Sequence, residues 1–95
     1  VVVEEYVFFG HSVSILTGTH DISKIGIERQ KAVPRSGRDV LIKKGAWIAS
    51  NTTIVGPCVV GENSVVGACS LVIEDIPPNS FFAGVPAKFI KKLEY

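Results

Sequence analysis

Aliphatic residues recur at every sixth position along the second half of the chain. Six of them, all β-branched, occupy one slot of this frame: Ile42, Ile48, Ile54, Val60, Val66 and Val72. Four positions after each comes a second slot, filled by small residues until Ile76 ends the pattern: Ala46, Thr52, Cys58, Ser64 and Ser70. A simple amphipathic strand does not explain one phase held through six consecutive hexads. The pattern therefore predicts an internal repeat.

The same frame occurs near the N-terminus. Its first slot holds Val3, Phe9 and Ile15, and its second slot holds Val7, Val13 and Thr19. From Ile15 to Ile42 is 27 residues, which is not a multiple of six. We therefore expect an insertion of irregular sequence that interrupts the repeat between His20 and Asp39.

A six-residue period fits a short strand followed by a sharp turn. One large and one small side chain of each unit would point inward, and turn-forming residues would supply the backbone angles of the corners. The candidates for these corners are Gly45, Asn51, Gly56, Gly61, Asn63, Gly67 and Asp75. Three strands close one triangular coil, and coils stack by parallel pairing. The sequence therefore predicts an all-β fold of the parallel β-helix type.

Length and charge exclude several classes of protein. With 95 residues the chain forms at most one domain and buries a modest share of its surface, which favours support from a partner subunit. The formal net charge is +1 and the basic residues are scattered, so no nucleic-acid partner is expected. No apolar run approaches the roughly 18 residues of a membrane-spanning helix, and no signal segment opens the chain. We expect a soluble, cytoplasmic protein.

Cysteine and histidine are few. Cys58, Cys69, His11 and His20 show no CxxC or CxxxH spacing, so no structural metal is expected. Cys58 fits an inward small slot and Cys69 fits a corner, and neither is predicted to be a nucleophile. The sequence contains no methionine, and we interpret it as the C-terminal portion of a longer chain.

Three motifs match a known family. They are "TGTH" at residues 17–20, "WI" at 47–48 and "DIPPNSFFAGVPAKFIKK" at 75–92. With the hexads, they resemble the hexapeptide-repeat acyltransferases, and within these the ends of galactoside, maltose and related sugar O-acetyltransferases. The resemblance implies a left-handed parallel β-helix, an exception to the usual right-handed crossover. It also implies acetyl-CoA as co-substrate without a metal, and a homotrimer with active sites between neighbouring subunits.

The frame divides this single domain into four parts: a coil at 1–20, an insertion loop at 21–39, a coil at 40–77 and a C-terminal tail at 78–95. Pro77 and Pro78 cannot donate to a parallel ladder and should end the coil. Residues 86–93 begin with a proline, which suits the first turn of a helix, and carry a short apolar stripe. We therefore expect a short C-terminal α-helix that lies back on the coil.

His20 ends the "TGTH" motif. Acetyl transfer from a thioester to a hydroxyl group needs a base, and a neutral imidazole is available near neutral pH. The resemblance implies that His20 is this catalytic base, whereas a histidine at a loop edge is otherwise an ordinary solvated residue. Asp21 is not assigned as its partner, because consecutive residues of an extended chain point to opposite faces. His11 falls in an outward slot and is expected on the surface.

Five further site residues are implied by the resemblance. Ser50 would contact the thioester or the developing oxyanion, and Trp47 would form a wall of the active site. Ala68 would line the channel for the pantetheine arm of CoA, and Lys88 and Lys91 would meet its phosphates. Four of them also have a structural explanation: Ala68 as a small corner residue, Lys88 and Lys91 as solvated lysines, and Trp47 as a cap at the end of the coil.

Two positions depart from the family pattern. Ala49 replaces a usual glycine and would narrow the slot, and Glu74 stands where relatives often carry a basic CoA contact. The sequence predicts an acetyl-CoA-dependent O-acetyltransferase that acts on a sugar or glycan-precursor hydroxyl group. Two alternatives stay open: an inactive β-helical scaffold or interaction domain, and a sugar N-acetyltransferase.

Overall fold

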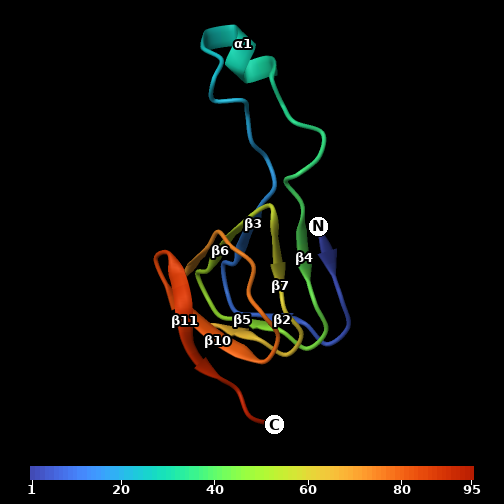
Figure 1. Cartoon of the computed structure of the whole chain (residues 1–95), viewed down its shortest axis with the longest axis vertical. Helices are drawn as coiled ribbons and strands as arrows, with labels where there is room; N and C mark the ends of the chain where they lie inside the picture. Colours follow the sequence, from blue (N-terminus) through green and yellow to red (C-terminus); the bar gives the residue numbers. More distant parts are fainter.

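Nine short strands wind into three stacked coils, each with three sides (Figure 1). The computed structural model describes residues 1–95. The coil strands are β1 (Val2–Val3), β2 (Phe8–Phe9), β3 (Ser14–Leu16), β4 (Val40–Ile42), β5 (Trp47–Ile48), β6 (Thr53–Val55), β7 (Cys58–Val60), β8 (Val65–Val66) and β9 (Leu71–Val72). A hairpin of β10 (Ser80–Gly84) and β11 (Ala87–Lys92) follows them, and the one helix is α1 (Gly26–Lys31).

Three sheets form the three sides of the coil. Sheet A has the order β1-β4-β7, sheet B the order β2-β5-β8-β10-β11, and sheet C the order β3-β6-β9. Paired residues of the second and third coils lie 18 positions apart, as Val40 and Cys58 do. Across the first and second coils the spacing is 39 positions, as between Ser14 and Thr53. The stacked parallel sheets confirm the predicted β-helix of hexapeptide repeats.

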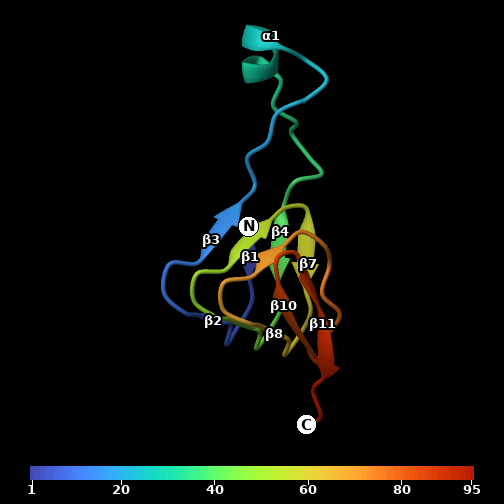
Figure 2. The same cartoon turned by 90° about the vertical axis from the view of Figure 1, so that its left-hand side faces the viewer.

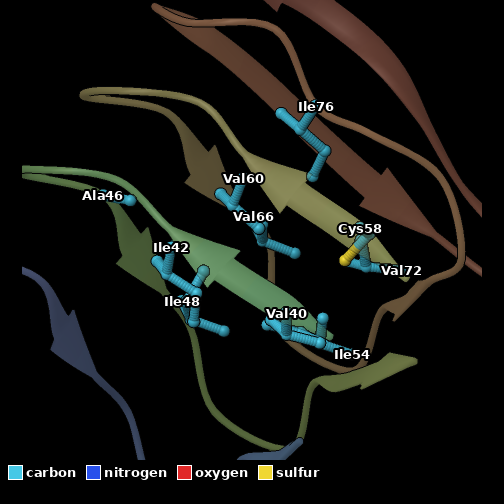
Figure 3. Close-up of a cluster of buried hydrophobic side chains, with 10 residues drawn as sticks. All are labelled: Val40, Ile42, Ala46, Ile48, Ile54, Cys58, Val60, Val66, Val72 and Ile76. Atoms are coloured by element: carbon cyan, nitrogen blue, oxygen red, sulfur yellow. The ribbon is translucent and has the colours of Figure 1, made fainter. Parts of the chain in front are cut away.

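The interior of the coil is built from the predicted inward slots (Figure 3). The large aliphatic residues of the hexads, from Ile42 to Val72, are at most 1% exposed, and the small residues from Ala46 to Ser70 are buried beside them. The first coil is covered on one side only, so Val3 and Phe9 of the same slots stay 44% and 41% exposed. Burial thus follows the six-residue frame.

Hydroxyl groups in the small slots are paired as well as buried. Ser64 Oγ donates to the Pro77 carbonyl oxygen over 2.6 Å and accepts from the Ser80 N–H over 3.1 Å. Ser70 Oγ donates to the Gly67 carbonyl oxygen over 2.7 Å. No buried side-chain nitrogen or oxygen lacks a partner. The small slots therefore satisfy their polar groups and tie the chain end to the third coil.

Left-handed backbone angles mark two of the three corners. Six non-glycine residues have φ between 53° and 62°: Tyr6, Ser12, Asn51, Asn63, Cys69 and Asn79. Among the predicted corner residues, Asn51, Asn63 and Gly45 have positive φ, and Cys69 lies at a corner as expected. Gly56, Gly61, Gly67 and Asp75 do not have positive φ. Asparagine tolerates this conformation because its short side chain can hydrogen-bond locally.

An arm of residues 17–39, here called the excursion, projects from the coil between β3 and β4 (Figures 1 and 2). It accounts for the longest dimension of the molecule, 50 Å. The sequence predicted irregular chain at 21–39, and the excursion contains the six-residue helix α1, which buries none of its residues. No helix of the structure is long and apolar enough to span a membrane.

The prediction of a C-terminal helix is wrong, because residues 87–92 form strand β11. β10 extends sheet B by pairing with β8, and β11 then pairs antiparallel with β10. Phe89 packs edge-on against Phe82, with ring centroids 5.9 Å apart. Gly84, with φ of 111°, makes the reversal that L-residues rarely adopt. Pairing at the free edge of sheet B thus satisfies the backbone hydrogen-bonding groups of the tail. An isolated helix of two turns would be only marginally stable by comparison.

Candidate active site

An open groove runs along sheet B where its strands approach the corner that leads to sheet C. It has a volume of about 590 Å³ and is lined by Gly10, Trp47, Ala49, Ser50, Val65, Gly67, Ala68, Phe81 and Leu93. Six of these nine residues are hydrophobic, and Ser50 supplies the one side-chain hydroxyl group. This set of residues, called the groove below, suits a slender and mostly apolar ligand held at one point by a polar donor.

The parallel register explains the apolar wall of the groove. Trp47 pairs with Phe8 of the first coil and with Val65 of the third, and Val65 pairs with Phe81. The rings of Phe8 and Trp47 stack with centroids 5.7 Å apart and planes 10° from parallel. Trp47 is 41% exposed and lies in the middle coil, so it does not cap the end of the coil.

Ser50 is held between two neighbouring coils. The His11 N–H donates to Ser50 Oγ over 2.9 Å, and the Asn51 N–H donates back to the His11 carbonyl oxygen over 2.8 Å. Gly10 allows this close approach, because an added Cβ there would lie 2.8 Å from the Cα of Ser50. Since Ser50 Oγ accepts a hydrogen bond, its own hydrogen is free to donate into the groove.

Two alanines line the groove. Ala68 is exposed and directly precedes the corner at Cys69. Ala49 is 9% exposed and lines the groove between Gly10 and Gly67. The methyl group that was expected to narrow the slot therefore stands in its wall.

Lys88 and Lys91 lie on β11 beside the groove but do not line it. Lys91 is the cross-strand partner of Phe81, and Lys88 is the partner of Ala83. Cross-strand partners share one face of a sheet, so both lysines stand on the outer face that carries the groove. Both are exposed. Glu74, in contrast, is exposed outside the groove.

His20 is exposed and lies outside the groove. It follows β3 by four residues, at the far end of sheet C, whereas the groove lies at the near end of that sheet. Its Nδ1 is 3.0 Å from the carbonyl oxygen of Arg29. One copy of the chain therefore brings together Trp47, Ser50 and Ala68, but it does not bring His20 to them.

No hydrogen bond joins the Asp21 carboxylate to His20. Its Oδ1 accepts hydrogen bonds from the Ser23 hydroxyl over 2.6 Å and from the Ser23 N–H over 3.0 Å. These two bonds hold the pKa of the Asp21 carboxyl below its usual value of 3.8. His11 is exposed, as its outward slot predicted. No three histidine, cysteine, aspartate or glutamate side chains lie close enough to hold a metal ion.

Several residues around the site were missed by sequence reasoning. Gly10 and Gly67 occupy the second position of their hexads, as the predicted Ala49 does, so the frame itself could have placed them beside it in one wall of the groove. Phe81 and Leu93 could not be found in this way, because Phe81 belongs to the hairpin and Leu93 directly follows it. The Arg29 carbonyl left no signal, since every residue carries one.

Comparison with known proteins places this arrangement in a family. Residues 39–74 match the family described as Bacterial transferase hexapeptide (six repeats). The galactoside O-acetyltransferase of Lactococcus lactis is 32% identical over 93 residues, which is 98% of this chain and 44% of that protein. The chain belongs to the hexapeptide-repeat acetyltransferase family.

Two solved structures of this family have the same fold. A maltose O-acetyltransferase from Clostridium difficile superposes with a TM-score of 0.84 at 34% identity, covering 98% of this chain and 49% of that one. A galactoside acetyltransferase in complex with coenzyme A also gives 0.84, at 30% identity, covering 97% of this chain and 44% of that one. The chain thus spans about half the length of these family members and corresponds to their C-terminal half.

Proposed function

We propose that the chain forms part of an acetyl-CoA-dependent O-acetyltransferase whose acceptor is a hydroxyl group of a sugar or glycan precursor. Its family and the similar galactoside and maltose O-acetyltransferases support this reaction class. The observation that carries the proposal is the groove, in which Trp47, Ser50 and Ala68 lie together although 21 positions separate the first from the last.

The groove fits the shape and chemistry of acetyl-CoA. A pantetheine arm is narrow, and its methyl and methylene groups would pack against the apolar wall of the groove, with the thioester by the hydroxyl group of Ser50. Lys88 and Lys91 stand on the same face, where their charge would meet the phosphates of CoA. The galactoside acetyltransferase of similar fold was solved with coenzyme A bound.

In the proposed reaction, His20 is the general base. Its Nε2 takes the proton from the acceptor hydroxyl while the oxygen attacks the thioester carbonyl carbon. The Ser50 hydroxyl group donates to the oxyanion that develops on the carbonyl oxygen. The C–S bond then breaks, and the imidazolium returns the proton to the leaving thiolate. The products are an acetyl ester and the free thiol of CoA, without a covalent acyl-enzyme.

Within one copy of the chain, His20 lies away from the groove. We therefore propose a homotrimer in which His20 of one copy acts at the groove of the next. The excursion supports this arrangement. Its residues Ile22, Ile25 and Ile27 are 85%, 77% and 58% exposed, and a neighbouring copy would cover them. A head-to-tail contact that closes a ring repeats one interface three times and builds three equal sites.

Thiol release from acetyl-CoA, measured with a panel of sugars and amino sugars, tests the proposal. His20→Ala should lower turnover with a sugar acceptor by about 10² to 10⁴-fold and leave CoA affinity unchanged. His11→Ala is the matched control, because it removes the other exposed histidine and should keep wild-type turnover.

The same assay separates the alternatives. Acetylation of amino sugars at nitrogen alone would support the N-acetyltransferase. Absence of both CoA binding and thiol release in the wild-type protein would leave the β-helical scaffold. A His20→Ala variant that melts like the wild type and keeps its rate would rule out His20 as the base.

A further inference from the structure

Arg29 links three points of the excursion. Its Nε donates to the carbonyl oxygen of Lys24 over 2.7 Å, and its Nη2 reaches the carbonyl oxygen of Ile22 over 3.4 Å. The carbonyl oxygen of Arg29 itself lies 3.0 Å from Nδ1 of His20. One residue therefore holds the loop before α1 with its side chain and contacts the imidazole with its backbone.

The loop that receives the guanidinium is fixed by its own hydrogen bonds. The Asp21 N–H donates to the Ala32 carbonyl oxygen over 2.8 Å and closes the outer part of the excursion, which carries α1. The Lys24 N–H donates to the Asp21 carbonyl oxygen over 3.2 Å, and the Asp21 carboxylate holds Ser23. These bonds fix the segment from Ile22 to Lys24, whose carbonyl oxygens accept hydrogen bonds from the guanidinium of Arg29.

Hydrophobic packing within one copy does not hold α1 in place. α1 buries none of its residues, and the N-cap residue before it, Ile25, makes no side-chain capping hydrogen bond. A six-residue helix is marginal without such support. The hydrogen bonds of Arg29, together with the backbone bond between Asp21 and Ala32, therefore help to keep α1, and with it the Arg29 carbonyl, in place beside His20.

We propose that Arg29 is a positioning residue for His20. The guanidinium holds the Arg29 carbonyl where it accepts a hydrogen bond from Nδ1–H of His20, so that the neutral imidazole keeps its lone pair on Nε2. The inference rests on the proposed role of His20 as the base. In it, a backbone carbonyl orients the imidazole ring and fixes its tautomer, a role that a carboxylate often has in other histidine sites. A planar two-pronged donor suits two carbonyl oxygens, and the single ammonium of lysine does not.

The tautomer of His20 tests the proposal without an acceptor. Long-range ¹H–¹⁵N NMR of the imidazole rings in the whole protein distinguishes the Nδ1–H form from the Nε2–H form, and His11 is an internal reference. Wild type should show His20 as the Nδ1–H form. Arg29→Ala should shift it toward the mixture of a free imidazole, with Arg29→Lys in between. Arg35→Ala is the control, because it removes an exposed arginine of the same excursion and should change nothing.

Kinetics give the second reading. Arg29→Ala should lower kcat by about 10 to 10²-fold, less than the loss of the imidazole itself, and leave KM for acetyl-CoA unchanged. A pure Nδ1–H signal for His20 in Arg29→Ala would overturn the proposal. So would an equal loss of kcat in Arg29→Ala and Arg35→Ala. If Arg29→Ala misfolds, as melting would show, the tautomer of Arg29→Lys decides.

Failure of the proposed function gives a different result. His20→Ala with wild-type turnover would remove the base and with it the positioning role, whatever the tautomer. A large loss in His20→Ala combined with an unchanged tautomer in Arg29→Ala would keep the function and overturn only the role of Arg29.

Discussion

The backbone N–H of His11 donates to Ser50 Oγ over 2.9 Å, across the junction of the first and second coils. A hydroxyl oxygen that accepts a hydrogen bond is polarised toward donating its own hydrogen. Because Ser50 lines the groove, this donor is available to a carbonyl oxygen bound there. The first coil thus contributes to the site through its backbone.

Ser50→Ala should therefore lower turnover more than it lowers binding. Loss of one oxyanion donor usually costs about 10² to 10³-fold in kcat, whereas CoA affinity should change by less than about threefold. Steady-state kinetics with acetyl-CoA and isothermal titration with CoA measure the two effects. Ser14→Ala is the control, since Ser14 is an exposed serine on β3 outside the groove. Unchanged kcat in Ser50→Ala would remove the hydroxyl group from the mechanism.

Replacing both Lys88 and Lys91 with alanine should weaken CoA more than dephospho-CoA. Both side chains stand on the outer face of sheet B beside the groove, and their charge is expected to meet the 3′-phosphate. We expect about a tenfold loss for CoA, consistent with one lost charge-assisted contact. Direct titration of both ligands measures the difference. The control is Lys43→Ala with Lys44→Ala, which removes equal charge from a different corner. An equal loss for both ligands would show that the lysines do not bind this phosphate.

Cys58 should make stability depend on pH above neutrality. Burial raises the pKa of its thiol from the ordinary 9.0 to about 11, and the negative charge of Asp75 adds to the shift. Between these values the unfolded chain loses the proton while the folded chain keeps it. The contribution of this thiol is thus complete below pH 9 and is lost as the pH rises toward 11, by on the order of 2 kcal/mol.

Urea unfolding at about pH 8 and about pH 10.5 measures this contribution when wild type is compared with Cys58→Ala. The free energy of unfolding should fall more steeply for wild type, because only wild type carries the buried Cys58 thiol. Cys69→Ala should keep the wild-type slope, since Cys69 is exposed. An equal fall in the free energy of unfolding between the two pH values for wild type and Cys58→Ala would contradict the raised pKa of the Cys58 thiol.

The coil could be predicted because its information is local and repeated. Each hexad carries its own inward residue, and burial of the residues from Ile42 to Val72 confirms the frame. The hairpin could not be predicted in this way. The apolar stripe near Phe89 suits a helix as well as a strand, and the free edge left by β8 decides between them through pairing distant in sequence.

The candidate site divides along the same line. Trp47, Ser50 and Ala68 lie at fixed positions of the frame, so their motifs place them together in one groove. The surroundings of His20 depend on how the excursion folds, and that segment has no repeat. Its hydrogen-bond partner is a backbone carbonyl nine residues away, which no side-chain pattern reveals.

Mixing of two inactive variants tests most directly whether His20 of one copy acts at the groove of another. His20→Ala removes the base, and Ala68→Trp fills the groove with an indole ring. Each variant alone should have little thiol release from acetyl-CoA. After joint unfolding and reassembly in equal amounts, random mixing around a closed ring should restore roughly a quarter of the wild-type activity. A chain with both substitutions, treated in the same way, should stay inactive. Absence of recovery in mixed trimers that contain both variants would contradict the shared site.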